Sequence, residues 1–310
     1  MTSLSKSLIR WYSHNKRNLP WRDTKNPYNI WVSEIILQQT RVNQGLNYYY
    51  HFIETFPDIQ TLANSDIDVL LKLWQGLGYY TRARNMHITA QEITKNLNNQ
   101  FPSNYNDLIK LKGVGDYTAS AIASISFNEK TPVVDGNVFR VISRIFGIAE
   151  STQTSSGKKI FKEKLLGIIP EDDPGTFNQA IMEFGALQCV PQNPDCQICP
   201  FIKSCFAYNN DLIGALPIKK QKVKQKDRYF NYLLITYDKF TFVEQRQEND
   251  IWKLLYQLPL IETDKKVSLK ELIKNENWIR LFKNTESEID SKIIEKKHIL
   301  SHQKIHASFV

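Results

Sequence analysis

The four cysteines of this chain lie within one stretch of seventeen residues. They are Cys189, Cys196, Cys199 and Cys205, spaced C-x6-C-x2-C-x5-C in a chain of 310 residues. Four thiolates on a short irregular loop can bind a zinc ion or an iron–sulfur cluster. Only Cys196 and Cys199 form the close pair that structural zinc sites commonly use twice. The spacing therefore predicts a four-thiolate site and leaves the metal open, with four free core thiols as the alternative.

Two carboxyl groups lie in surroundings that would give them opposite protonation states. Glu34, in WVSEIILQQT, lies on an apolar helical stripe, where loss of hydration raises the pKa of a carboxyl. Asp135, in TPVVDGNVF, precedes a helical run, whose dipole and backbone N–H groups would keep it ionised. Together they would make a matched acid and electrostatic stabiliser. The simpler interpretations are a Glu34 that reaches water and an Asp135 that only caps a helix.

Two glycines precede another helical run in LKGVGDYTASAIASI, residues 111–125. Gly113 and Gly115 permit backbone conformations that direct free N–H groups outward at a helix N-terminus, which suits a phosphate oxygen. An ordinary turn between helices is the alternative, because a lone G-x-G is a weak signal.

The elements that must position these residues are mainly helical. Apolar residues recur at helical spacing in 29–42, 66–74, 82–97 and 118–127. After the cysteines, six Lys and Arg residues between positions 219 and 228 predict an exposed linker, with phosphate contact as the alternative. The stretch YFNYLLITYD and the run 242–246 then predict strands, and 269–273 predicts a helix. We expect an all-helical domain followed by a small α+β domain.

The composition narrows the possible partners and compartments. The chain has 40 Lys and Arg against 32 Asp and Glu, a net charge of +8, which favours a polyanionic partner such as nucleic acid. With 42% hydrophobic residues, the chain is neither disordered nor fibrous. It has no signal-peptide pattern and no apolar run near the ~18 residues of a membrane span. We therefore expect a cytoplasmic protein, nucleoid-associated if bacterial, in a reducing compartment where clustered cysteines bind metal.

The combined motifs resemble a known family. LKGVG, VVDGNV and the cysteine loop resemble the helix-hairpin-helix DNA glycosylases of the endonuclease III superfamily, whose loop holds a [4Fe-4S] cluster. Three further stretches are similar to the adenine DNA glycosylase (MutY) family: LPWR, WVSEIILQQTRV and GLGYYTRARN. The likeness covers nearly all of residues 7–215. The resemblance implies a catalytic domain at 1–215 with its hairpin motif at 111–125 and its cluster loop at 189–205. It also implies that the four cysteines bind the cluster and that zinc is second choice.

The resemblance implies roles for individual residues. Glu34 matches the catalytic acid, Asp135 the carboxylate that stabilises the sugar cation, and Asn137 a supporting amide. The residues implied to contact DNA or the lesion in this domain are Arg22, Gln39, Thr40, Leu77, Tyr79, Gly113, Gly115 and Tyr117. Gln39 and Tyr79 would enter the base stack beside oxidised guanine, although a tyrosine such as Tyr79 could also be a core aromatic.

Tyr117 separates two branches of the superfamily. Bifunctional members carry a Lys at this position, whose amine forms a Schiff base with the sugar and permits strand cleavage. A phenol cannot form an imine, so we expect base removal without an efficient lyase step. Lys110 and Lys112 lie nearby in the sequence and leave a weak lyase reaction open.

The C-terminal part resembles the family's recognition domain, which is related to Nudix hydrolases. We expect a basic linker at 216–228 and this domain at 229–310. LSHQKIH matches the loop that contacts oxidised guanine, with Ser301 and His302 as the readers; an ordinary surface histidine is the alternative for His302. No Nudix box is present, so pyrophosphate hydrolysis is not expected. The family's domain usually continues beyond the position of Val310, so we expect either a shortened domain or a sequence that stops before the end of the domain.

The resemblance implies a monofunctional enzyme of base-excision repair. It would act as a monomer on double-stranded DNA, with no membrane partner, and would remove adenine mispaired with 8-oxoguanine or guanine. One alternative is a related glycosylase that acts on thymine or oxidised pyrimidine. A non-catalytic iron–sulfur DNA-binding protein is the other, and it would be favoured if Glu34 and Asp135 lay far apart.

Overall fold

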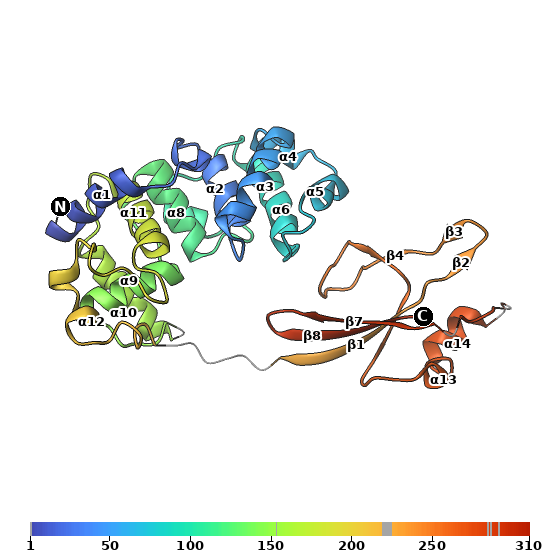
Figure 1. Cartoon of the computed structure of the whole chain (residues 1–310). Helices are drawn as coiled ribbons and strands as arrows, with labels where there is room; N and C mark the ends of the chain where they lie inside the picture. Colours follow the sequence, from blue (N-terminus) through green and yellow to red (C-terminus); the bar gives the residue numbers. More distant parts are fainter. Residues whose placement is uncertain (1, 153, 219–224, 284, 286, 291) are drawn as a thin grey trace. The chain divides into compact units, whose positions relative to one another are not determined.

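The chain forms two compact units, Met1–Lys220 and Gln221–Val310. The computed structural model describes residues 2–152, 154–218, 225–283, 285, 287–290 and 292–310 (Figure 1). The first unit is helical and the second is built mainly from strands, as the sequence predicts. No helix among these residues is long and apolar enough to cross a lipid bilayer.

The helical unit contains two kinds of helix, amphipathic ones at the surface and apolar ones inside. Its elements are α1 (Ser3–Asn15), η1 (Pro20–Arg22), α2 (Pro27–Ile36), α3 (Val42–Thr55), α4 (Ile59–Ala63), α5 (Ile67–Leu73), α6 (Thr81–Asn96), α7 (Tyr105–Leu108), α8 (Asp116–Phe127), α9 (Gly136–Phe146), α10 (Ser155–Leu166), α11 (Pro174–Leu187), η2 (Ile202–Ser204) and α12 (Phe206–Asn209). Eight of the ten residues of α2 are buried, because this helix packs against both α8 and α3.

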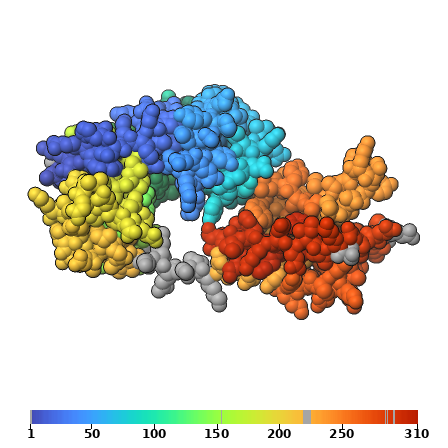
Figure 2. All heavy atoms as spheres, viewed as in Figure 1, coloured from blue at the N-terminus to red at the C-terminus, as the bar shows by residue number. Residues whose placement is uncertain are grey.

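A large core joins the two ends of this unit. Leu8 of α1, Val141 of α9, Phe161 of α10 and Phe184 of α11 are almost fully buried in one cluster. Cys189 and Cys199 lie against the same cluster. Figure 2 shows α1 and the region around residue 200 side by side on the surface of this unit. The cysteine loop is therefore anchored to the N-terminal helix through this core.

Local signals explain where the helices begin and end. Asn26 caps α2 through a bond from the Tyr28 N–H, and Pro27 follows as its first residue. α9 ends at Gly147, whose φ of +69° is the left-handed conformation that favours glycine. These short-range preferences fix the ends of the helices that carry Glu34 and Asp135.

The second unit contains a four-stranded sheet with the order β6-β1-β8-β7. Its elements are β1 (Lys226–Tyr232), β2 (Thr236–Tyr237), β3 (Phe240–Thr241), β4 (Glu244–Gln245), β5 (Tyr256–Gln257), β6 (Leu260–Thr263), α13 (Leu269–Leu272), α14 (Glu276–Phe282), β7 (Ile294–Ile299) and β8 (Gln303–Phe309). β1 pairs parallel with β8 and antiparallel with β6, while β7 pairs antiparallel with β8. Phe230 and Ile305 are buried on one face of this sheet, and Ile261 packs with Trp278 elsewhere in the unit.

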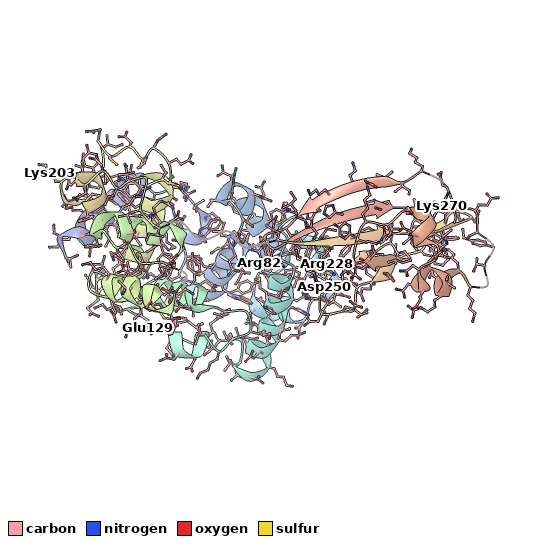
Figure 3. All side chains as sticks on the ribbon, turned by 90° about the horizontal axis from the view of Figure 1, so that it is seen from below. Arg82, Glu129, Lys203, Arg228, Asp250 and Lys270 are labelled. Carbon is pink, nitrogen blue, oxygen red and sulfur yellow. The ribbon has the colours of Figure 1, made fainter. Side chains whose placement is uncertain are left out.

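The linker expected at 216–228 differs from the structure at its C-terminal end. Residues 219–224 lie outside the described part of the chain, but β1 already begins at Lys226. Arg228 is held by Asp250 and Glu262, at 2.7 Å each, and Figure 3 shows Arg228 and Asp250 close together. Sequence reasoning counted Arg228 as a linker charge because its acidic partners lie 22 and 34 positions away in the chain.

Candidate active site

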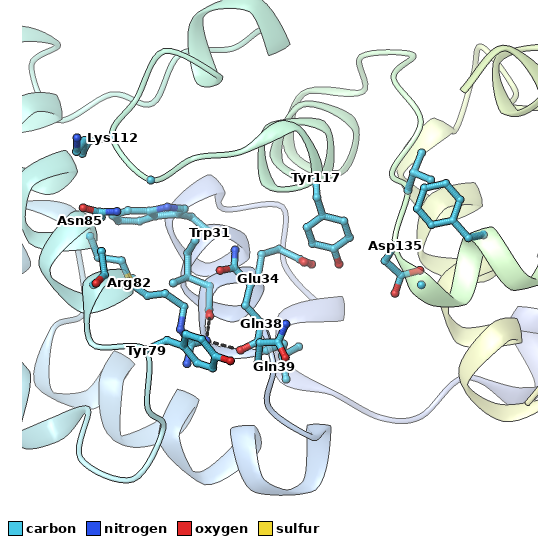
Figure 4. Close-up of a pocket in the computed structure, with 18 residues that line it drawn as sticks. Trp31, Glu34, Gln38, Gln39, Tyr79, Arg82, Asn85, Lys112, Tyr117 and Asp135 are labelled. Atoms are coloured by element: carbon cyan, nitrogen blue, oxygen red, sulfur yellow. Dashed lines mark hydrogen bonds between the residues drawn. The ribbon is translucent and has the colours of Figure 1, made fainter. Parts of the chain in front are cut away.

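Glu34 and Asp135 line the same open pocket in the helical unit. Its volume is about 790 Å³, and it also takes in Gln39, Tyr79 and Gly113 (Figure 4). An adjacent pocket of about 240 Å³ shares Glu34, Tyr117 and Asp135 with the first. The two carboxyl groups therefore lie where the pockets meet. This placement argues against the non-catalytic alternative, which needed the two residues to be far apart.

Glu34 has the properties of a proton donor at neutral pH. It lies in the last turns of α2 and is 7% exposed. Burial raises its pKa to about 7, and the nearby charge of Asp135 acts in the same direction. The Tyr117 hydroxyl and the charge of Arg22 lower the pKa only in part. The apolar helical stripe thus has the effect on Glu34 that the sequence predicts.

Asp135 is the N-cap of α9, as its position in the sequence suggests. Its carboxylate accepts bonds from the Val138 N–H at 2.7 Å and from the Asn137 amide at 2.9 Å. Burial nevertheless raises the pKa of Asp135, while these hydrogen bonds and the charge of Arg140 act against the rise. The sequence argument considered only the cap and the dipole, because the burial comes from segments that are distant in the chain.

Asn137 connects Asp135 to the cysteine loop. Its side-chain oxygen accepts a bond from Arg140 at 2.9 Å, and the same guanidinium donates to the Cys189 carbonyl at 2.7 Å. Arg140 also donates to the Gly185 carbonyl at 2.7 Å and is 8% exposed. A hydrogen-bonded path thus leads from the pocket to the first cysteine. Asn137 therefore contacts Asp135 directly, where the resemblance implies a supporting amide, and Arg140 is a residue that sequence reasoning missed.

The four cysteines line one small cavity beside Ile145 and Phe184. Burial raises the pKa of Cys189, Cys196 and Cys199, the last to about 11. Arg144 lies against this cavity and its guanidinium is 3.5 Å from the Cys189 sulfur. Within the described residues, no three His, Cys, Asp or Glu side chains are arranged to hold a single metal ion. The convergence of four thiols beside buried arginines suits an anionic four-thiolate group.

Gln39 and Tyr79 occupy exposed turns at the pocket. Both have a left-handed backbone, with φ of +63° and +47°, which is uncommon for residues other than glycine. Tyr79 is 47% exposed, so it is not the core aromatic that was the alternative. Thr40 follows Gln39 and lines the adjacent pocket. Leu77, by contrast, is only 7% exposed and belongs to the interior of its turn.

Only one of the two hairpin glycines needs its conformational freedom. Gly113 has a φ of +76°, and a Cβ there would lie 2.6 Å from the Cβ of Asn85. Gly115 has a φ of −88°, which any residue can adopt, and it serves as the N-cap of α8. Gly115 therefore does not use the conformational freedom that a glycine permits. Its N-cap position still leaves backbone N–H groups of α8 at the helix start.

Arg22 is committed to an ion pair inside the protein. Its guanidinium lies 2.6 Å from the carboxylate of Glu183 on α11, and Arg17 binds the same carboxylate at 2.5 Å. Burial would raise the pKa of Glu183, but bonds from Arg22 and Arg17 outweigh it and hold the pKa at about 2. All three residues line the pocket that holds Asn137. Sequence reasoning missed Arg17 and Glu183 because no local pattern distinguishes them from ordinary surface charges.

Ser301 and His302 belong to the second unit. They lie exposed in the turn between β7 and β8, and the His302 carbonyl accepts a bond from the Lys226 N–H at 3.0 Å. The turn is formed by a regular antiparallel pair, in which Ile299 faces Lys304. These two side chains are thus presented at the end of a hairpin.

Comparison with known proteins identifies the family. Residues 32–168 match the model of the HhH-GPD superfamily base excision DNA repair protein. The adenine DNA glycosylases of two Buchnera aphidicola subspecies, Baizongia pistaciae and Schizaphis graminum, are each 38% identical. These matches cover 96% and 97% of this chain and 82% and 85% of the relatives. The human adenine DNA glycosylase is 39% identical over 67% of this chain and 40% of its own length.

Solved structures agree on the fold of the helical unit. A thermostable thymine-DNA glycosylase superimposes with a TM-score of 0.61 at 26% identity, over 67% of this chain and 95% of the other. An endonuclease III in a non-covalent complex with DNA has a TM-score of 0.58 at 21% identity, over the same shares. The near full-length relatives, together with the family model, show that the chain belongs to the adenine DNA glycosylase family of helix-hairpin-helix base-excision repair proteins.

Proposed function

We propose that this protein removes adenine mispaired with 8-oxoguanine or guanine in double-stranded DNA, by hydrolysis of the bond between base and sugar. The observation that carries the proposal is the meeting of Glu34 and Asp135 in one pocket, beside the exposed turns of Gln39 and Tyr79. A protonated carboxyl beside a hydrogen-bonded carboxylate is the pair that cleavage of a glycosidic bond requires.

Binding must first move the adenosine out of the base stack, because the reacting carbon is inaccessible in a duplex. Unpairing costs least at a mismatch, which supplies part of the selectivity. Gln39 and Tyr79 would fill the space left in the stack. The first α8 turn, with Gly113 and Gly115 before it, offers N–H groups for a backbone phosphate.

Glu34 would then donate its proton to adenine N7, so that the base leaves as a neutral molecule. As the bond to the sugar breaks, its electron pair goes to the base and a cation develops on the sugar. Asp135 would stabilise this cation through its negative charge, and Asn137 would hold the carboxylate in place. Water adds to the sugar carbon and releases a proton, which completes the hydrolysis.

A [4Fe-4S] cluster would be held by the four cysteines, Cys189, Cys196, Cys199 and Cys205. When bound, the cluster would stabilise the C-terminal end of the catalytic unit. The shared cavity and the guanidiniums of Arg140 and Arg144 beside Cys189 support this assignment, because they favour negative charge there. Lys203, in the same loop, is exposed at the end of the helical unit (Figure 3) and would lie near phosphate. In the second unit, Ser301 and His302 would contact the oxidised guanine.

A panel of duplexes tests the substrate assignment. Adenine opposite 8-oxoguanine and opposite guanine should be released as free base under single-turnover conditions, whereas thymine opposite guanine should stay in place. The excised base is identified directly by mass spectrometry. Release of thymine or of an oxidised pyrimidine, with adenine untouched, would favour the related glycosylase instead.

Strand integrity tests the role of Tyr117. Its phenol lies beside Glu34 and its hydroxyl is 3.3 Å from the sulfur of Met182, so no amine occupies this place in the pocket. After adenine release, the product strand should stay intact at neutral pH and break only in hot alkali. Prompt cleavage at neutral pH that is trapped by borohydride would show an imine-forming lysine, and Lys112, which lines the pocket, is the first to replace.

A further inference from the structure

Arg82 joins the two exposed turns that carry Gln39 and Tyr79. One nitrogen of its guanidinium donates to the carbonyls of Ile35 at 2.7 Å, Ile36 at 3.3 Å and Gln38 at 2.5 Å. Its other terminal nitrogen donates to the carbonyls of Leu77 and Gly78, both at 3.1 Å. Figure 4 shows Arg82 next to Tyr79 and Gln38 in the pocket wall.

The contacted carbonyls lie at three points that determine the shape of this wall. Ile35 and Ile36 end helix α2, which carries Glu34, and the Ile35 carbonyl also accepts a bond from the Gln38 N–H at 3.3 Å. The carbonyl of Gln38 immediately precedes Gln39, and that of Gly78 immediately precedes Tyr79. Arg82 therefore holds both turns directly next to their left-handed residues.

The backbone at Gln39 and Tyr79 needs such support. A positive φ at a residue other than glycine persists only where the surrounding contacts hold it. The guanidinium also lies 5.2 Å from the ring centre of Trp74 and 5.8 Å from that of Tyr79. Trp74 is fully buried, so Arg82 is stacked against a fixed surface.

A purely structural arginine of this kind would be expected to pair with an acid. Among the described residues, no carboxylate forms an ion pair with Arg82, and its charge is met by carbonyl oxygens and rings. Burial lowers its pKa to about 10, which leaves the group charged at neutral pH. The chain therefore keeps a half-buried cation without an acidic partner among the described residues, next to the two turns that carry Gln39 and Tyr79.

We propose that Arg82 is a positioning residue that holds the turns of Gln39 and Tyr79 at a fixed separation, so that both side chains can enter the base stack together when a nucleotide leaves it. The proposal rests on the proposed function, because it assumes that a nucleotide is moved into this pocket. Loss of Arg82 would then impair extrusion of the nucleotide much more than the breaking of its glycosidic bond.

The test uses two duplexes that differ in the cost of extrusion. In one, adenine is opposite guanine; in the other, it is opposite a stable abasic analogue and has no pairing partner. With the full chain in excess, the Arg82→Gln variant should release paired adenine roughly 10- to 100-fold more slowly than the wild type. It should stay within about 3-fold of the wild type on the unpaired adenine, because extrusion is then cheap.

Two further measurements separate positioning from loss of the fold. Fluorescence of 2-aminopurine at the target position should rise on binding to wild type and rise less with Arg82→Gln, a readout that does not depend on adenine release. Arg82→Lys keeps the charge, but its single ammonium nitrogen cannot donate to the carbonyls of both turns. Its rate of release of paired adenine should therefore lie between those of the wild type and Arg82→Gln. Lys95→Gln removes an exposed charge from the other end of α6 and should match the wild type on both duplexes.

Equal losses on the paired and the unpaired duplex would overturn the proposal, as would an Arg82→Gln variant with wild-type rates and fluorescence. If Arg82→Gln does not fold, the same comparison is made with Arg82→Lys, whose melting temperature is measured first. A wild-type protein that raises 2-aminopurine fluorescence but releases no adenine would contradict the proposed function alone.

Discussion

A Glu34→Gln variant should bind a mismatch duplex with nearly unchanged affinity and release adenine about 10² to 10⁴-fold more slowly than the wild type. Glutamine keeps the size of the side chain and has no carboxyl proton to give to adenine N7. Glu34 is buried in the last turns of α2 and burial raises its pKa to about 7, so a substantial fraction of the wild type carries this proton at neutral pH. The measurement is base release in a single turnover, with binding followed separately by a gel-shift or anisotropy titration.

Exposed Glu54 on α3 provides the matched control, and Glu54→Gln should leave the rate unchanged. The wild-type rate should also depend on pH. Stabilisation of the cation needs an ionised Asp135, whose pKa is raised by burial, so release should be slow in acid. Above about pH 7, Glu34 loses its proton and release should fall about tenfold per pH unit. A rate that rises through this range, or Glu34→Gln at near wild-type speed, would remove Glu34 from the role of acid.

Stability distinguishes this loss from a failure to fold. A carboxyl whose folded pKa is raised binds its proton more tightly in the native state, so the free energy of unfolding falls as pH rises above the unfolded pKa. Replacing Glu34 by glutamine removes that dependence. The variant should therefore be at least as stable as the wild type at pH 8, and a clear loss of stability there would point to a packing defect instead.

An Asp135→Asn variant should be roughly 10² to 10³-fold slower in adenine release, at unchanged DNA affinity. Asparagine can still accept the bond from the Val138 N–H and cap α9, so the substitution removes the negative charge and preserves the local fold. The Asp135 carboxylate is half-buried in the pocket with Glu34, and a developing cation there would lose its counter-charge. Single-turnover release opposite 8-oxoguanine is the measurement.

Asp173→Asn is a close control for this substitution. Asp173 is the N-cap of α11 and accepts a bond from the Thr176 N–H at 3.2 Å, and it lines neither pocket that contains Glu34. The Asp173→Asn variant should show any effect on stability that comes from changing an N-cap carboxylate. Its rate of adenine release should nevertheless equal that of the wild type. If both variants slow release to the same extent, the effect belongs to helix capping and Asp135 is not the stabilising charge.

The local features of this protein are readable in the sequence because each depends on neighbours three or four residues away. The apolar stripe around Glu34, the cap at Asp135 and the left-handed glycine at Gly113 all belong to this class. The cysteine spacing is equally local, since its seventeen residues can form a loop by themselves. The motifs also identify the family, which the near full-length relatives confirm.

Only the tertiary structure decides which of these residues meet. Glu34 and Asp135 come from different helices, and the burial that raises the pKa of Asp135 is a property of packing between distant segments. The pairing of Arg22 with Glu183 and the five carbonyls around Arg82 have no sequence signature, because every residue has a backbone carbonyl and most surface helices carry charges. The sequence by itself therefore determined the helices, the turns and the chemical groups available, whereas long-range packing decided which groups share a pocket and which arginines hold its walls.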